Sequence, residues 1–274
     1  PVFGDKYIDT IKTTDITRWN RERGLKGNKG GAYSQQYINN MYLHMSGLLT
    51  FAVNHRFIND NPCRYARPYK DPNQVKPVQE SEINFWEVEE YNRFIATVKD
   101  IDRKERYDTL FLTGLRIGEL LALRWRDLDL TNRKLSVKAT LAPNTRNITS
   151  PKTTNSLRTI DLPLRLNEEL KYRYERYCKL DGFNKDYFVF GDIEPRSVTP
   201  IRRYFYIDIA AAGVKRITLH GLRHSHASYL LANPQLSEAL VAERMGHSIE
   251  MLRKTYAHIY EKRRTALVDY IENL

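Results

Sequence analysis

Four separated segments of the chain carry side chains that could act on a phosphodiester. They are Thr113–Trp125, Pro151–Ile160, Leu219–Ser228 and Met245–His258. The first and third of these segments contain Arg116 and Arg223, and a guanidinium can hold phosphate oxygens through paired hydrogen bonds while it stays charged. His220 precedes Arg223 by one helical turn, so the two side chains share a helix face. Taken singly, these residues are equally consistent with surface charges or a capping pair.

Three further residues could supply a nucleophile and move protons. Tyr256 carries a hydroxyl, but a phenol with a pKa of about 10 is a poor nucleophile until its proton is removed. His247 titrates near neutrality, so it could donate a hydrogen bond or transfer a proton. Lys152 lies in a polar stretch between two predicted strands. Taken singly, Tyr256 could equally be a core aromatic and Lys152 a surface charge.

Taken together and in this order, the segments resemble the tyrosine recombinase (phage-type integrase) family over about residues 87–258. The catalytic residues that the resemblance implies are Tyr256, Arg116, Glu119, Lys152, His220, Arg223 and His247. The resemblance makes Tyr256 the nucleophile and Lys152 the acid that protonates the departing 5′ oxygen. It also predicts that Glu119, one helical turn after Arg116, orients that arginine or a histidine. The chain matches the family pattern at each of these positions.

The reaction that the resemblance implies is the cleavage and rejoining of DNA strands. Attack by Tyr256 would give a 3′-phosphotyrosyl bond and a free 5′ hydroxyl, and the covalent bond would store the energy needed for rejoining without ATP. The resemblance therefore predicts a site-specific recombinase that integrates or excises a mobile element or prophage. It implies a homotetramer on two duplex DNA sites and leaves room for accessory DNA-bending or directionality proteins.

No cofactor and no metal is expected for this reaction. Carboxylates that could hold Mg²⁺ do not cluster near the four segments. His224 and His226 do not have the spacing of a metal-binding pair on a helix. Only two cysteines occur, Cys63 and Cys178, which excludes a disulfide framework and a zinc finger.

The composition indicates a globular protein with a polyanionic partner. Lysine and arginine total 44 against 33 acidic residues, a net charge of +11, and this excess favours nucleic acid because neutralised phosphates release counterions. No stretch approaches the roughly 20 apolar residues that a membrane span requires, and no signal peptide is visible. We therefore expect a cytoplasmic, nucleoid-associated protein. The chain begins at Pro1, which predicts that its natural N-terminus, with an arm-binding domain in this family, lies upstream.

The N-terminal part of the chain predicts a helical DNA-binding domain. Asp15 is expected to cap a short helix and Ser34 a long one, with a Gly-rich basic loop at 24–31 between them. The positions of the long helix that recur at helical spacing and are expected to face inward are Ile38, Met41, Tyr42, Met45, Leu48, Leu49, Ala52, Val53 and Phe57. Four prolines within 62–77 predict a break over residues 66–80. We divide the chain into a core-binding domain (1–75), a linker (76–85) and a catalytic domain (86–274).

The catalytic domain is predicted to be mostly α-helical with a small antiparallel β-sheet, an α+β fold. Helices are expected at 87–99 and 117–123, and an apolar segment at 107–112 leads to the corner at 113–115. Strands are expected at Lys134–Thr140 and Arg158–Leu162, with a polar loop at 149–157 between them. Everything after about Leu164 is expected to be helical, apart from the apolar run at 187–190. The two domains are expected to close around duplex DNA as a clamp.

The C-terminal tail predicts an amphipathic helix. Its apolar residues, which recur at helical spacing, are Ala266, Leu267, Tyr270, Ile271 and Leu274. The apolar face must be buried, either on its own domain or, as the resemblance favours, on a neighbouring protomer in a cyclic exchange.

Two other functions remain open at this point. Residues 237–258 resemble a helix-turn-helix, which would suit a non-catalytic DNA-binding regulator, but such a regulator has no need of Arg116, Lys152, Arg223 or Tyr256. A type IB topoisomerase uses similar chemistry without exchanging partners, and the sequence does not separate it from a recombinase.

Overall fold

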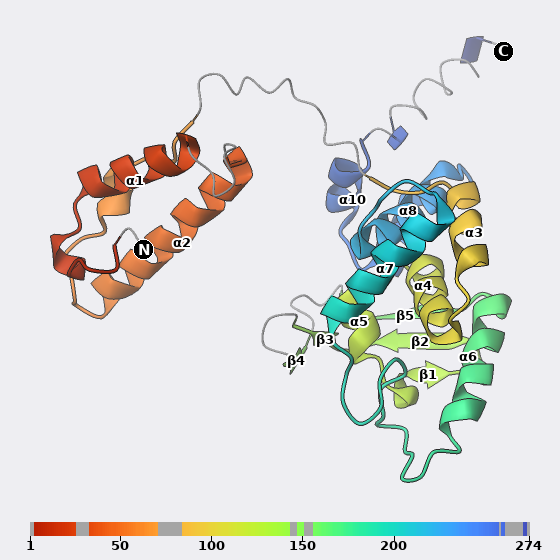
Figure 1. Cartoon of the computed structure of the whole chain (residues 1–274). Helices are drawn as coiled ribbons and strands as arrows, with labels where there is room; N and C mark the ends of the chain where they lie inside the picture. Colours follow the sequence, from red (N-terminus) through yellow and green to blue (C-terminus); the bar gives the residue numbers. More distant parts are fainter. Residues whose placement is uncertain are drawn as a thin grey trace. The chain divides into compact units, whose positions relative to one another are not determined.

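The computed structural model describes residues 3–25, 33–70, 84–142, 147–150, 156–257, 259–260 and 271–272. The chain forms two compact units, 1–81 and 82–274 (Figure 1). Lys152, most of the predicted tail helix and most of the predicted linker lie outside the described residues.

The first unit is built from two helices, α1 (Thr13–Leu25) and α2 (Gln35–Asn54), with two short 3-10 turns, η1 (Ile8–Thr10) and η2 (Pro62–Tyr65). The predicted cap at Ser34 is confirmed, because its hydroxyl accepts a hydrogen bond from the backbone N–H of Tyr37. The predicted cap at Asp15 is wrong: α1 begins two residues earlier, and the Asp15 carboxylate accepts from the backbone of Lys12.

One face of α2 is buried as predicted, through Ile38, Tyr42, Leu49 and Ala52. The Tyr42 hydroxyl donates to the carbonyl of Ala66, which ties the chain after η2 back onto the helix. Leu48 and Phe57 were expected on this face but are exposed. Leu48 points away from the buried face, and Phe57 lies beyond the end of α2.

The break predicted over residues 66–80 begins too early. Side chains of the two helices hold residues 66–70 in the first unit, since Asn20 Nδ2 donates to the Arg67 carbonyl at 2.9 Å and Gln35 Nε2 to the Tyr69 carbonyl at 2.7 Å. At the other end, Asn84 donates to the Arg216 carbonyl at 2.7 Å. Asn84, which was predicted to lie in the linker, therefore belongs to the second unit.

The second unit is mostly helical with small antiparallel sheets, as predicted. Its helices are α3 (Val88–Thr97), α4 (Ile101–Thr113), α5 (Ile117–Ala122), α6 (Leu164–Tyr177), α7 (Val198–Ala212), α8 (Leu219–Ala232), α9 (Glu238–Met245) and α10 (Ile249–Thr255). A 3-10 turn, η3 (Trp125–Asp127), follows α5. Helix α4 contacts α8 and α6, while α3 contacts α7. These contacts bring the segment around residue 115 next to the segment around residue 220.

Within the described residues, five short strands form two separate sheets. Strands β1 (Leu128–Asp129), β2 (Lys134–Val137) and β5 (Arg158–Asp161) form an antiparallel sheet in the order β1-β2-β5, with Leu135 opposite Ile160. Strands β3 (Thr140–Leu141) and β4 (Ile148–Thr149) form the second sheet. The single strand predicted at 134–140 is therefore wrong, because the chain leaves the first sheet after Val137.

The segments 178–186 and 191–197 are not helical, contrary to the prediction, whereas the run at 187–190 is non-helical as predicted. Helix α6 ends at Tyr177 and α7 begins at Val198, and the intervening segment contains Gly182, Gly191 and Pro195. Phe188 forms an isolated antiparallel bridge with Arg124 and is buried. Glycine and proline disfavour a continuous helix here.

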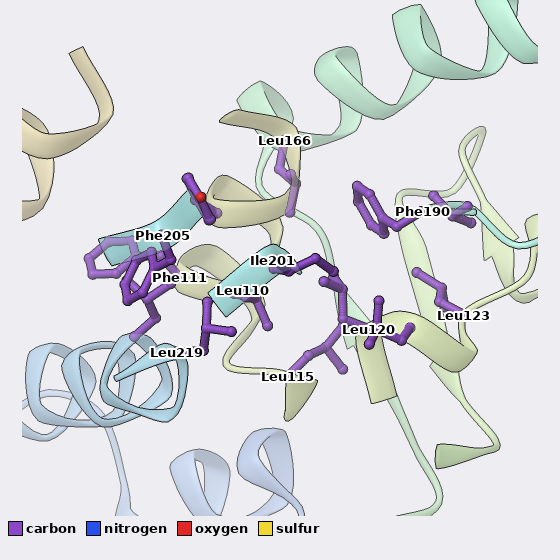
Figure 2. Packing of buried hydrophobic residues seen from close by; sticks show 14 of the residues in the cluster. Leu110, Phe111, Leu115, Leu120, Leu123, Leu166, Phe190, Ile201, Phe205 and Leu219 are labelled. Atoms are coloured by element: carbon purple, nitrogen blue, oxygen red, sulfur yellow. The ribbon is translucent and has the colours of Figure 1, made fainter. Parts of the chain in front are cut away.

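A large hydrophobic cluster fills the space between α3, α4, α5, α6, α7 and the sheet. Figure 2 shows part of it, with Leu110, Leu115, Leu120, Ile201 and Phe205 among the labelled residues. A second, smaller cluster joins α8, α9 and α10 through Ala227, Leu231, Val241, Ala242, Met245, Leu252, Tyr256 and Ile259. Described residues of all four motif segments belong to these clusters: Leu115, Ile160 and Leu219 to the larger and Tyr256 to the smaller. Within the described residues, no helix has the length and apolarity that a membrane crossing would require.

Candidate active site

Arg116 sits at the corner between α4 and α5. Helix α4 ends at Gly114, whose positive φ of 68° lets the chain turn sharply. Glu119, in the first turn of α5, accepts from the Arg116 backbone N–H at 2.9 Å and from Arg116 Nη1 at 2.8 Å. The Glu119 side chain is 3% exposed and that of Arg116 is 34% exposed. The buried carboxylate therefore anchors a guanidinium that still reaches solvent.

Glu119 has a second cationic partner, Arg158, which the sequence analysis did not single out. Arg158 Nη2 and Nη1 donate to the two carboxylate oxygens of Glu119 at 2.8 and 3.2 Å. Burial raises the pKa of Glu119, but the hydrogen bond and charge of Arg158 outweigh burial and hold that pKa at about 2. Glu119 is therefore ionised at any pH at which the protein would be assayed.

Arg223, on α8, is buried and held by two backbone carbonyls. Its Nη1 donates to the Gly114 carbonyl and its Nη2 to the Met245 carbonyl. Its Nε has no hydrogen-bond partner among the described residues. Burial, followed by the charge of Arg116, lowers the pKa of Arg223 to about 9, so the side chain stays cationic at neutral pH. Protein contacts thus fix the orientation of this guanidinium before any substrate binds.

His247 lies directly after Gly246, which ends α9 in the left-handed conformation. Its Nε2 is 2.9 Å from Arg223 Nη2, and since a guanidinium only donates, Nε2 carries the lone pair. Burial, then the charges of Arg223 and Arg116, lowers the pKa of His247 to about 3. The neutral ring must therefore carry its proton on Nδ1, which is buried without a partner among the described residues. The site thus contains a hydrogen-bond donor that no described group accepts from.

Tyr256 ends α10 and is only 1% exposed. Its hydroxyl is hydrogen-bonded to His224 Nδ1 at 2.9 Å, and burial raises the pKa of the phenol. The His224 ring meets the His220 ring edge-on, with 4.7 Å between centroids. His224 was set aside in the sequence analysis because its spacing did not suit a metal, yet it lies between His220 and Tyr256.

Further contacts tie the end of α9 to α8 and α4. The buried His226 accepts from Arg244 Nε at 3.1 Å through its Nε2, and Arg244 Nη2 donates to the Leu112 carbonyl at 3.0 Å. The turn between α9 and α10 also supplies the Met245 carbonyl and His247 to Arg223. This turn therefore helps to build the site, a role that a helix-turn-helix regulator would not require of it.

These contacts place six of the seven predicted residues in three contacting groups. Arg116 and Glu119 contact each other, and Arg223 contacts His247 and the Gly114 carbonyl. His220 and Tyr256 meet through His224. The catalytic roles of these residues stay predictions, and Lys152 lies outside the described residues. Among the residues that the structure describes, no group of three or more metal-binding side chains is present.

The chain is similar to known integrases. The model of the phage integrase family matches residues 84–263. The ICEBs1 integrase of Bacillus subtilis is 28% identical over 275 residues, covering 95% of this chain and 70% of that protein. The integrase of Staphylococcus phage L54a is 26% identical over 268 residues, covering 88% of this chain and 75% of that protein.

Solved integrase structures share the fold. The Tn1549 transposon integrase in complex with transposon right end DNA superimposes with a TM-score of 0.68 at 23% identity, covering 96% of this chain and 86% of that chain. A lambda integrase tetramer bound to a Holliday junction gives a TM-score of 0.57 at 18% identity, covering 88% of this chain and 65% of that chain.

Proposed function

The chain belongs to the phage integrase family and is a site-specific DNA recombinase of mobile elements, and we propose that Tyr256 is the nucleophile of its strand-cleavage reaction. The observation that carries this proposal is the network around Arg223. That arginine contacts the corner before Arg116, the end of α9 and His247, while Tyr256 joins the same helix through His224.

In the proposed reaction, three donors hold the phosphate. These donors are the half-exposed guanidinium of Arg116, Nε of Arg223 and Nδ1–H of His247. Arg223 Nε and His247 Nδ1 have no hydrogen-bond partner among the described residues, and the Arg116 guanidinium reaches solvent. Preorganised donors of this kind stabilise the charge that builds on the non-bridging oxygens in the transition state. Fixed donors matter most because they need no rearrangement as the charge develops.

The cleavage step forms one bond and breaks one. The Tyr256 oxygen bonds to phosphorus, the bond from phosphorus to the 5′ oxygen breaks, and the phenolic proton passes to an imidazole of the site. Lys152 protonates the departing 5′ oxygen. Rejoining is the reverse reaction: a 5′ hydroxyl attacks the phosphotyrosine, and the phenol is released with its proton restored. The number of phosphoester bonds is unchanged, so no ATP is needed.

We extend the proposal to the partners of the protein. The Tn1549 integrase structures contain transposon DNA, and lambda integrase is seen as a tetramer on a Holliday junction. A net charge of +11 suits the same polyanion. We propose that this chain binds duplex attachment sites and assembles on them as a tetramer, with accessory DNA-bending or directionality proteins, and that it associates with the nucleoid.

Tyr256→Phe tests the nucleophile. The variant removes only the phenolic oxygen, so it is expected to bind site DNA with nearly unchanged affinity. On a nicked suicide substrate, which traps the covalent intermediate, it is expected to form no protein–DNA adduct. Tyr260→Phe is the matched control and should form the adduct. An adduct with Tyr256→Phe would show that another residue attacks.

Lys152→Ala tests the general acid. A substrate with sulfur in place of the bridging 5′ oxygen has a leaving group that needs no proton. Cleavage by the variant should be impaired on the oxygen substrate and restored on the sulfur substrate. Equal impairment on both would remove Lys152 from this role.

A further inference from the structure

Arg158 is a buried arginine that uses all three of its guanidinium nitrogens within the protein. Besides its two bonds to Glu119, its Nε donates to the Arg244 carbonyl at 2.8 Å and its Nη1 to the Ser156 carbonyl at 3.2 Å. Its side chain is buried to the same extent as that of Glu119. The family resemblance gave this residue no part in the reaction.

These contacts join three separate parts of the site. Glu119 belongs to α5 and holds Arg116. Arg244 belongs to the end of α9, where the next carbonyl, that of Met245, holds Arg223. Ser156 lies four positions after Lys152 in the sequence, at the end of the segment that leads into β5. Arg158 therefore contacts the carboxylate that holds Arg116, the end of α9 that holds Arg223, and the segment that follows Lys152.

The charges favour a specific role. Glu119 is buried between two guanidiniums, and Arg158 binds both of its oxygens whereas the Arg116 side chain binds one. Without Arg158, burial would favour the neutral acid, and a neutral Glu119 would hold Arg116 more weakly. Arg158 cannot contact the phosphate itself, because it is buried and its nitrogens are engaged.

We propose that Arg158 is a positioning residue that keeps Glu119 ionised and centred, and thereby orients Arg116 on the scissile phosphate. This role rests on the function proposed above. It differs from a merely structural role, which would lower the amount of folded protein without changing how the reaction depends on pH.

The test is the pH dependence of single-turnover cleavage of the suicide substrate, compared with the unmodified protein. At about pH 8, where Glu119 is ionised in both proteins, Arg158→Gln is expected to cleave about 10–100-fold more slowly, the usual effect of losing a supporting partner. Towards about pH 5.5 the ratio of the two rates is expected to fall further, because the pKa of Glu119 rises once Arg158 is gone. Arg158→Lys keeps the charge and should remove this extra fall.

Two controls separate positioning from folding. Adding Glu119→Gln to Arg158→Gln removes the titrating group, so the rate ratio should become independent of pH. Arg173 is the matched control for Arg158, because it is also a buried arginine and forms ion pairs with Asp102 and Glu105 on α4. Arg173→Gln should lower the free energy of unfolding. At each pH, however, its cleavage rate per folded molecule should equal that of the unmodified protein.

The outcomes are distinct. A rate ratio for Arg158→Gln that does not change with pH, or a loss that Arg173→Gln reproduces, would overturn the positioning role. If Arg158→Gln does not fold, Arg158→Lys and Glu119→Gln test the role instead. The role requires that Glu119→Gln slows cleavage and that the cleavage rate of Arg158→Lys, relative to the unmodified protein, does not fall towards about pH 5.5. Tyr256→Phe is assayed in parallel. An adduct there would refute the proposed nucleophile, whereas its absence together with a constant rate ratio would refute only the role of Arg158.

Discussion

The Tyr256 hydroxyl and His224 Nδ1 lie 2.9 Å apart, inside the small cluster formed by α8, α9 and α10. Burial, followed by the charges of His220 and Arg223, lowers the pKa of His224 to about 4, so its ring is neutral at pH 7. Burial raises the pKa of Tyr256. The proposed nucleophile therefore rests protonated, covered and hydrogen-bonded, and it has to leave this position to reach a phosphate.

His224→Leu is predicted to increase the exposure of Tyr256. Leucine removes the partner of the buried hydroxyl, and leaving such a group unsatisfied costs about 1–3 kcal/mol, which corresponds to a shift of about 5- to 150-fold towards the exposed position. Hydroxyl-radical footprinting with peptide mass spectrometry measures this exposure. His220→Leu, on the same helix but without a hydrogen bond to Tyr256, should change it little. Unchanged labelling in His224→Leu would show that packing alone covers the tyrosine.

The stability of the protein is predicted to fall as the pH drops from about 6.5 to 5. Burial lowers the pKa of His226 to about 3, so the unfolded chain binds a proton in this window that the folded chain does not bind. Stability is then fully present above the unfolded pKa of 6.5 and is lost below it by about 1.4 kcal/mol per pH unit for each such histidine. His224 and His247 act in the same direction.

Urea unfolding at several pH values measures this loss. His226→Gln can still accept from Arg244 but does not titrate, so its slope with pH should be smaller by about one proton. An unchanged slope would mean that His226 is protonated in the folded protein.

Gly114→Ala is predicted to damage both folding and cleavage. The added Cβ would lie 2.6 Å from the His226 ring and 2.9 Å from the Met245 sulfur, and the carbonyl of Gly114 holds Arg223. Gly213 is the matched control, with a similar φ of 62° and nothing within 4 Å of an added Cβ. Gly213→Ala should cost only the backbone strain, about 1–2 kcal/mol, and leave cleavage per folded molecule unchanged. Thermal melts and single-turnover cleavage measure the two effects, and equal behaviour of the two variants would contradict this prediction.

Arg223→Lys is predicted to reduce cleavage far more than DNA binding. Lysine keeps a positive charge, but its single ammonium cannot replace the two Nη atoms that bind the Gly114 and Met245 carbonyls together with the Nε that has no protein partner among the described residues. Cleavage should fall by about 10²–10³-fold, the cost of losing a preorganised donor. A gel-shift titration and a suicide-substrate assay on the same preparation give both quantities. Equal losses in the two assays would show that Arg223 acts only as a phosphate anchor.

Local patterns in the sequence predicted the elements well where a local rule decides the outcome. Ser34 caps α2 because capping involves residues three apart, and strands begin at Lys134 and Arg158 where β-rich runs begin. The predictions were wrong where distant contacts decide. Residues 66–70 were predicted to lie in the break, yet Asn20 and Gln35 bond the Arg67 and Tyr69 carbonyls to the first unit.

The same distinction applies to the site. Arg116, Arg223 and Tyr256 were predicted from the order and spacing of family motifs, and the structure brings Arg223 next to the corner before Arg116. Arg158 was missed because its partner Glu119 lies 39 residues away, and a charged residue at the start of a strand has no local sign of burial. His224 was missed because its neighbour Tyr256 lies 32 residues away. Such long-range pairings form only when α5, β5, α8 and α10 are in place.

The division of the second unit into two hydrophobic clusters predicts that Tyr256 can open separately from the larger core. Tyr256 and Leu252 belong to the smaller cluster, whereas Leu110 and Leu120 belong to the larger one. Moving α10 outward disrupts only the smaller cluster, so it requires a fraction of the free energy of global unfolding. Amide hydrogen exchange at Leu252 and Tyr256, compared with Leu110 and Leu120, measures that fraction. If the proposed assembly on DNA makes the tyrosine accessible, this is the free energy that it would supply.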